Sequence, residues 1–410
     1  MLTNLGEVQD EEYVMTGDSD IETLHNRLNP PGVLALAHRF FGGISQGYYS
    51  GEEIQTTEDE PGMNPKYIAE LLSVDDDNAL AVLRLLDSCE AYEDHPAQPI
   101  DLFSLEISQE DMVADSLKAL KTIFGWTKAA AGQIFNEMTN YELAARYIAF
   151  HAENVSTLAS DRRKNSQYDH KPLVINTRIA NLSVRYAPVK DIASLIVALR
   201  GLSNVTKDYF SYNDDSLLNL VDRLPSLVGD LGSLQTALNN VSPAKLFRTQ
   251  SFYPSDKQGF YVTSHLLGCH RVSIKTQETS NGLDARYSVR LVPSDMSPRP
   301  LPTSIEFKRF NIPALEQCLK QIVDIAEYLQ EINTVMTRQR RMARMERIAL
   351  LTQRLAKEIE AGGFDSERHR SVIALINQYN DWITSPYKEL YGLVCRNLRA
   401  ALNVCEINAM

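Results

Sequence analysis

The sequence lacks long hydrophobic runs. No segment of its 410 residues reaches the roughly 18 consecutive apolar residues that a membrane-spanning helix needs. The best candidate, Ile192–Leu199, is far too short and is followed by Arg200. The acidic beginning MLTNLGEVQDEE lacks the basic and apolar regions of a secretory signal. These absences argue against a membrane protein and a secreted one, and they predict a protein made in the cytoplasm with no membrane partner.

Cysteine is also scarce, and none of the five cysteines forms a C-x-x-C pair. Their number is odd and they are widely spaced: Cys89, Cys269, Cys318, Cys395 and Cys405. This pattern argues against a disulfide framework and against a zinc knuckle. Cys269 and His270, with His265 nearby, could be metal ligands, but their neighbours predict a strand and a turn, and no second ligand pair follows. We therefore expect no metal and no cofactor.

The sharp motifs of catalysis are missing as well. The sequence contains no Gly-x-x-x-x-Gly-Lys phosphate loop, no His-Glu-x-x-His and no Gly-x-Ser-x-Gly. Catalytic groups can be scattered along a chain, so an enzyme built in residues 172–310 stays open as an alternative. We expect no catalytic residue and a protein that is not an enzyme.

Charge is present but unevenly distributed. Residues 1–93 hold 19 acidic and 4 basic residues, a net charge of −15, whereas residues 94–410 hold 34 and 37, a net charge of +3. Such a division is typical of an acidic arm attached to a neutral or slightly basic body. The change falls within DSCEAYEDHPAQP, Asp87–Pro99.

Periodicity predicts a mainly α fold with a small antiparallel β-sheet (α+β) and a C-terminal long-helix bundle. We expect four parts: an acidic, partly helical, propeptide-like segment over 1–93, a helical segment over 94–165, a mixed α+β domain over 166–310 and a helical bundle over 311–410. Alternating apolar and polar residues predict strands at 260–264, 271–276, 286–292 and 304–310. Asn281-Gly282 is typical of a hairpin turn between two of them.

Long helical patterns occupy both ends of the body. Residues 110–156 have a helical pattern that Gly125 and Gly132 are expected to interrupt. From Asn311 onward apolar residues recur every three or four positions until Gly362-Gly363, which predicts one helix of nearly fifty residues with a kink near 338–344. Two more helices, 366–384 and 386–405, would close an antiparallel bundle.

The densest basic segment is TRQRRMARMERIALLTQRLAK, Thr337–Lys357. Clustered arginines can neutralise phosphates in a sequence-independent, salt-sensitive way. The nucleic-acid contact candidates are Arg338, Arg340, Arg341, Arg344, Arg347, Arg354 and Lys357. The alternatives are a solvated helix face and pairing with the acidic N-terminal part.

The charge change coincides with two adjacent small-x-Glu triplets, Ser88-Cys89-Glu90 and Ala91-Tyr92-Glu93. They follow a predicted helix and precede Pro96, and a third triplet ends at Glu106. Proteases need an extended, accessible segment, and this composition fits one. The stretch is therefore a candidate site of proteolytic processing.

The order of parts resembles the internal head proteins, the prohead inner-core and ejected proteins, of giant tailed bacteriophages of the phiKZ type. The resemblance covers the C-terminal two-thirds, and diffuse patterns carry it: HLLGCHRVSIKT leading to RYSVRLVPS, then PTSIEFKRFNIPALEQCLKQIVDIAEYLQ, and SPYKELYGLVCRNLRAALNVCE at the end. DSLKALKTIFGWTK is similar to the start of the mature part of such proteins.

The resemblance implies a structural virion protein of the phage head interior, matured by a prohead protease and ejected with the DNA. It implies cleavage after a small-x-Glu triplet, with Glu93 as the first candidate, Glu90 as the second and Glu106 as the third. The implied partners are the prohead protease, other head and core proteins, and packaged DNA bound without sequence specificity. The alternative is a cytoplasmic helical adaptor or nucleic-acid-associated binding protein regulated by its acidic N-terminal arm.

Overall fold

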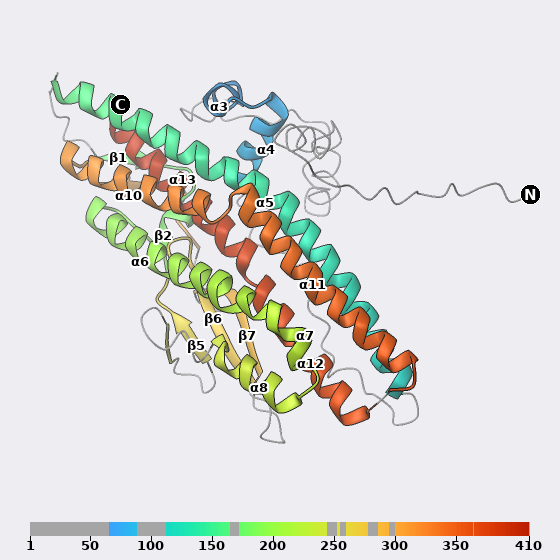
Figure 1. Cartoon of the computed structure of the whole chain (residues 1–410). Helices are drawn as coiled ribbons and strands as arrows, with labels where there is room; N and C mark the ends of the chain where they lie inside the picture. Colours follow the sequence, from blue (N-terminus) through green and yellow to red (C-terminus); the bar gives the residue numbers. More distant parts are fainter. Residues whose placement is uncertain are drawn as a thin grey trace, which may run out of the picture. The chain divides into compact units, whose positions relative to one another are not determined.

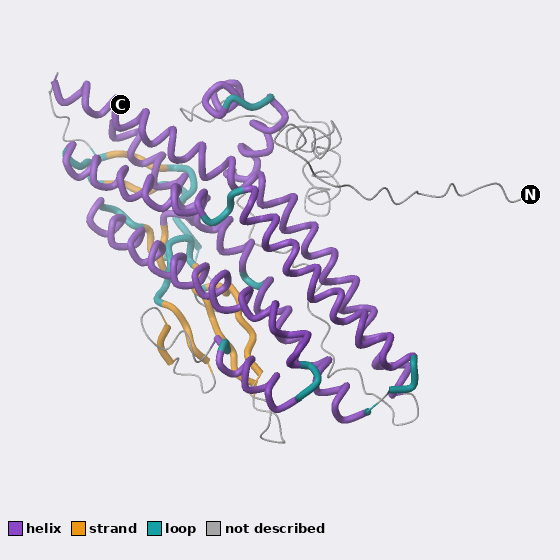
Figure 2. Tube along the Cα trace, viewed as in Figure 1, coloured by secondary structure: helices purple, strands orange, loops and turns teal. Residues whose placement is uncertain are grey.

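The computed structural model describes most of the chain after residue 64. The described residues are 65–87, 112–164, 172–243, 252–254, 260–277, 286–294, 300–363 and 365–409. Helices dominate these residues, and the strands are short and antiparallel (Figure 2). The expected mainly α fold with small antiparallel sheets is confirmed. None of the described helices combines the length and the apolarity needed to cross a membrane.

One helix organises the fold. α5, Met112–Lys164, has 53 residues and is about 80 Å long at 1.5 Å per residue. It runs through Gly125 and Gly132 without a break, which corrects the expected interruption there. Glycine in a helix interior costs about 1 kcal/mol relative to alanine, and the packing of the buried face outweighs this cost. Figure 1 shows four C-terminal helices gathered along α5: α10, Ile312–Glu331; α11, Val335–Glu360; α12, Ser366–Thr384; α13, Tyr387–Ala409.

α10 and α11 follow one another along α5 in the antiparallel direction. Glu142, in the middle of α5, pairs with Arg338, near the start of α11, and Lys121 lies 3.9 Å from Glu360 at the other end of α11. The single helix expected up to Gly362 is therefore wrong, since the chain breaks at residues 332–334. Thr334 begins α11 as an N-cap whose side chain accepts a hydrogen bond from the Thr337 backbone N–H.

α12 and α13 run along α5 in the parallel direction. Asn380 of α12 donates to the hydroxyl of Thr127 at 2.7 Å. Further along both chains, a Cβ on Gly392 of α13 would lie 2.9 Å from the Tyr141 hydroxyl. Nearly every described residue of α13 is buried, so the last helix of the chain lies in the centre of the core.

The core ignores two of the expected domain boundaries. A single cluster of buried apolar residues extends from Ile68 to Ala409 and includes α5 and all four C-terminal helices. The expected parts 94–165, 166–310 and 311–410 therefore share one core. Contacts divide the chain into Met1–Gln55 and Thr56–Met410 instead, so the expected boundary at 93 is corrected too.

The mixed region supplies a sheet and a helical layer beside this bundle (Figure 1). A four-stranded antiparallel sheet has the order β4-β5-β6-β7, and β1 pairs with β8 and β2 with β3 in separate ladders. The strand bounds are Leu173–Ile175, Ser183–Val184, Ala187–Pro188, Phe252–Pro254, Phe260–Thr263, His270–Gln277, Arg286–Pro293 and Ile305–Phe307 for β1 to β8. The three strands expected over 260–292 are confirmed, whereas the one expected at 304–310 is β8, outside the four-stranded sheet.

The helical layer begins with α6, Ile192–Ser211, whose N-cap is Asp191. It continues through a π-helical turn, η2, Tyr212–Leu217, which leads into shorter helices. These are η3, Leu218–Arg223; α7, Leu224–Leu227; and α8, Leu231–Asn240, with η1, Ala180–Leu182, preceding α6. Two helices precede α5: α3, Pro65–Leu72, and α4, Asp76–Asp87.

A tight turn fastens the sheet to α13. Gly268 has φ +84°, and a Cβ there would lie 2.7 Å from the Asn397 amide oxygen. Asn397 donates from its side chain to the Leu267 carbonyl at 2.6 Å. Glycine is required at this position because both the backbone conformation and the contact with α13 exclude a side chain.

Candidate functional site

The basic helix α11 is divided between the interior and the surface. Arg338 is 5% exposed and Arg341 is 3% exposed, so neither can reach a phosphate. The Nη1 atom of Arg338 donates to Glu142 at 2.5 Å and to the Asn333 carbonyl at 2.6 Å. The prediction that Arg338 and Arg341 contact nucleic acid is therefore wrong, because burial and acidic partners occupy both guanidinium groups.

The other candidates lie on the outer side of α11. Arg340, Arg347, Arg354 and Lys357 are exposed, and Arg344 is half-buried. Arg347 forms an ion pair with Asp222 of η3. Surface ion pairs of this kind are weak, so Arg347 remains accessible to a polyanion. These five residues stay candidate nucleic-acid contacts.

The sequence carried a signal for this division. Buried residues of α11 recur at alternating intervals of three and four: Arg338, Arg341, Met345, Ile348, Thr352, Leu355 and Ile359. This is the heptad pattern of a helix whose buried stripe faces a neighbouring helix. Extending the apolar pattern backward from Met345 places both arginines on the buried stripe.

Arg341 is the centre of a buried polar node. Its Nη1 atom donates to Asp214 at 2.7 Å, and its Nη2 atom donates to the Asn213 side-chain oxygen at 2.7 Å and to the Ile383 carbonyl at 2.5 Å. The Asn213 amide donates in turn to the Trp382 and Ile383 carbonyls. The node thus joins α11 to the π-helical turn η2 and to the end of α12.

The node is charged and largely withdrawn from water. Burial raises the pKa of the Asp214 carboxyl, and the adjacent Arg341 guanidinium opposes that rise. A π-helical turn, rare in proteins, aligns Asn213 and Asp214 with one guanidinium. The sequence gave no signal for this pairing, because residues 213–214 and 341 are far apart in the chain. The arrangement fixes the geometry of three helices, and its buried groups are already occupied by one another.

A second buried group lies between α5 and α13. The Nε2 atom of His151 lies 3.1 Å from Glu406, and Arg399 lies 3.6 Å from the other carboxylate oxygen of Glu406. The Tyr147 ring stacks on the His151 ring with centroids 5.4 Å apart. All three charged or titratable side chains are at most 5% exposed, so the cluster holds α13 against α5 rather than meeting solvent.

Cys269 and His270 have structural partners. The Cys269 sulfur accepts a hydrogen bond from the Tyr186 backbone N–H at 3.2 Å. The Nδ1 atom of His270 lies 2.5 Å from the Gly268 carbonyl, and burial lowers the pKa of His270. Within the described ranges, no three His, Cys, Asp or Glu residues gather as a metal site would require.

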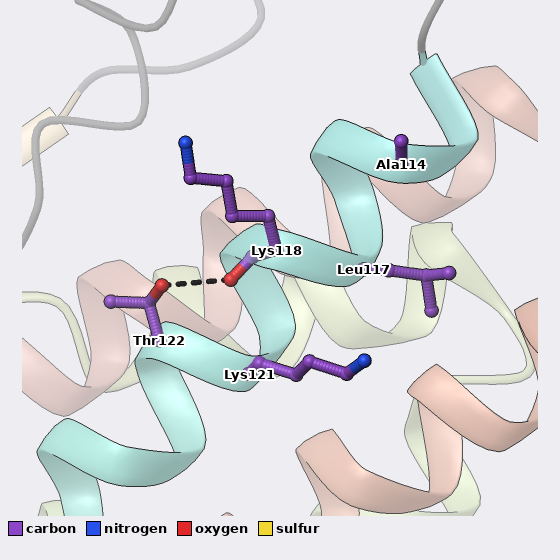
Figure 3. Close-up of a pocket in the computed structure, with 5 residues that line it drawn as sticks. All are labelled: Ala114, Leu117, Lys118, Lys121 and Thr122. Carbon is purple, nitrogen blue, oxygen red and sulfur yellow. Dashed lines mark hydrogen bonds between the residues drawn. The ribbon is translucent and has the colours of Figure 1, made fainter.

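A surface pocket of about 520 Å³ lies at the beginning of α5 (Figure 3). Its lining residues come from one helix: Ala114, Leu117, Lys118, Lys121 and Thr122. The Thr122 hydroxyl donates to the Lys118 carbonyl at 2.7 Å within that helix. A built ligand site usually has polar groups that converge from several elements, and these five residues do not supply them.

The cleavage candidates Glu90, Glu93 and Glu106 lie outside the described residues. They fall between the end of α4 at Asp87 and the beginning of α5 at Met112. Part of the expected propeptide is nevertheless described, because α3 and α4 bury Ile68, Leu72, Val82 and Leu86 in the common core. The acidic arm is thus not wholly separate from the body.

Comparisons with protein families, with curated proteins and with solved structures find no match to this chain.

Proposed function

We propose that this protein is a structural, non-catalytic component of the head interior of a phiKZ-type giant phage, matured by proteolysis between α4 and α5. The proposal rests on the resemblance of the C-terminal two-thirds to internal head proteins and on the charge division at the same place. A cut after Glu90, Glu93 or Glu106 removes a segment of strong negative charge and leaves a body near +3.

The position of the candidates supports this proposal. A cut there interrupts no described helix, since all three candidates lie between Asp87 and Met112. The contacts of α5 with the four C-terminal helices stay within one chain after the cut, so the body keeps its core. A substrate whose product remains folded suits a particle that must retain the mature protein.

The charge distribution gives the maturation a physical purpose. An acidic segment keeps a core protein soluble and repels DNA while the head assembles. Residues 1–64 carry 12 acidic and 2 basic residues, a net charge of −10, so most of the negative charge precedes α3. Loss of the segment lets the body coexist with densely packed DNA. Cleavage is irreversible, so it gives assembly a direction.

Mass spectrometry of the protein from purified particles tests the proposal. We expect a new N-terminus at Asp94, with Ala91 and Ile107 as the products of the second and third candidate sites. The triple variant Glu90→Gln/Glu93→Gln/Glu106→Gln should stay uncut, whereas Glu153→Gln, an exposed glutamate of α5, should be processed normally. An intact Met1, or a protein found only in the host cell, would contradict the proposal.

The exposed residues of α11 support a second candidate, non-specific binding of nucleic acid. Arg340, Arg354 and Lys357 project from one helix of a body with a small positive charge. Their joint substitution by alanine should weaken DNA binding and reduce its dependence on salt concentration by the loss of about three phosphate contacts. Retention of full affinity by the triple variant would rule out this surface.

A further inference from the structure

The helices α3 and α4 bind the body in a recognisable way. In α4 the buried apolar residues are Ala79, Val82, Leu83 and Leu86, at spacings of three, four and seven from the first. This is the anchor pattern of an amphipathic helix that lies in an apolar groove of a partner. α3 adds Ile68 and Leu72, which are at most 1% exposed. In Figure 1 the two helices lie beside α5, and α4 also contacts α13.

An arginine of the body fixes the end of α4. The Nη1 atom of Arg178 donates to the Leu86 carbonyl at 2.6 Å. The last carbonyls of a helix lack partners within the helix and form the negative end of its dipole, so a guanidinium is well suited to them. Arg178 is only 9% exposed, and its backbone φ of +52° is a conformation that side chains other than glycine seldom adopt. The body thus holds a preformed contact for the end of this helix.

We propose that α5, α13 and Arg178 form a binding site for the α3–α4 hairpin that does not need the covalent connection to it. The occupant is residues 65–87 of this same chain. The inference deepens the proposed maturation: after a cut beyond α4, the acidic fragment stays bound to the body through this hairpin. Its release is then a second step, driven by dilution or by a competitor for the groove.

Specific cleavage of the purified full-length protein tests the inference without any phage. A recognition sequence for a site-specific protease is inserted between Glu93 and Asp94, and complete cutting is verified by mass. At micromolar concentration we expect the 1–93 fragment to elute with the 94–410 fragment in gel filtration. Leu86→Asp, which places a charge among the anchors, should separate them.

Matched arginine variants identify the contact. Arg178→Ala should weaken rebinding of a labelled 1–93 fragment by about tenfold or more, the usual effect of losing a charge-assisted hydrogen bond. Arg223→Ala, an exposed arginine of η3, should leave the affinity unchanged. In the uncut protein, Arg178→Ala should also speed hydrogen exchange across 65–87 while exchange in α13 stays the same.

Two results would overturn the inference. The cut fragments would separate at micromolar concentration in the otherwise unaltered protein, or Arg178→Ala and Arg223→Ala would have the same effect on affinity and exchange. Neither result bears on where the chain is cut in a particle. Conversely, an intact Met1 in particles would remove the proposed maturation and leave the docking of α3–α4 as measured.

Discussion

The guanidinium carbon of Arg341 lies 3.6 Å from the centroid of the Tyr387 ring. The same guanidinium donates to Asp214 and to the Ile383 carbonyl, so it contacts a ring, a carboxylate and a backbone oxygen. Tyr387 begins α13 and Ile383 ends α12, so Arg341 bridges their junction from α11. A residue that the sequence marks as part of a basic surface is therefore a central support of the bundle.

Replacing Arg341 should be far more damaging than replacing its neighbour. Arg341→Ala leaves Asp214 and Asn213 without their buried donor, and the expected loss in the free energy of unfolding is about 3 kcal/mol. Arg340→Ala removes an exposed side chain and should change that free energy by no more than about 0.5 kcal/mol. Urea denaturation of both variants measures the difference. Equal effects would show that Arg341 is not buried as described.

The two ion pairs of α11 should differ in strength. Arg338, 5% exposed, pairs with Glu142, whereas Arg347 and Asp222 are both at least 50% exposed. A double-mutant cycle should give a coupling energy of about 2 kcal/mol for the first pair and less than about 1 kcal/mol for the second. Added salt should weaken only the second coupling appreciably. A cycle with equal values for both pairs would contradict the division of α11 into buried and exposed sides.

Two helical glycines should respond in opposite ways to alanine. At Gly392 a Cβ would lie 2.9 Å from the Tyr141 hydroxyl, and the Tyr141 ring is itself confined by Tyr391 at 5.5 Å. Gly392→Ala should cost about 1–3 kcal/mol through overpacking between α5 and α13. At Gly201 of α6 a Cβ meets nothing within 4 Å, so Gly201→Ala should stabilise by up to about 1 kcal/mol. Thermal unfolding distinguishes the two, and stabilisation by Gly392→Ala would refute the close approach of the helices.

Local patterns in the sequence predicted the elements better than their assembly. Alternation over 260–292 located three strands, and the Asn311 N-cap located the beginning of α10. The break before Thr334 was missed because the apolar repeat continues through residues 332 and 336 in phase, and the cap is a single threonine. Such a cap is decisive only when a third element, here α5, accepts the displaced chain.

The packing of α5 against α10–α13 could not be predicted from the sequence. No local pattern in residues 112–164 specifies which distant helices share its surface, and the candidate residues of α11 looked uniformly basic. Only the heptad position separated Arg338 and Arg341 from Arg340 and Arg354. The partners Glu142 and Asp214 lie far away in the chain, so the function of the buried arginines became clear only from the assembled helices.

The N-cap of α6 provides a pH-dependent contribution to stability with a defined sign. The Asp191 side chain accepts hydrogen bonds from the Ser194 backbone N–H at 2.8 Å and from the Ser194 hydroxyl at 2.9 Å. These bonds lower the pKa of Asp191 below its usual value of 3.8. A lowered pKa in the folded state means that the stabilisation is present above about pH 4 and is lost as the pH falls through the folded-state pKa.

Two substitutions separate the charge from the cap. Asp191→Ala should cost about 1 kcal/mol at pH 7, and this difference from the natural protein should shrink in strongly acidic solution. Asp191→Asn retains a good capping side chain but cannot titrate, so its free energy of unfolding should fall less steeply below pH 4. Urea denaturation at pH 7 and pH 3 measures both effects. Parallel pH curves for the natural protein and Asp191→Asn would mean that the carboxylate caps the helix no better when ionised than when protonated, and the lowered pKa of Asp191 would then be refuted.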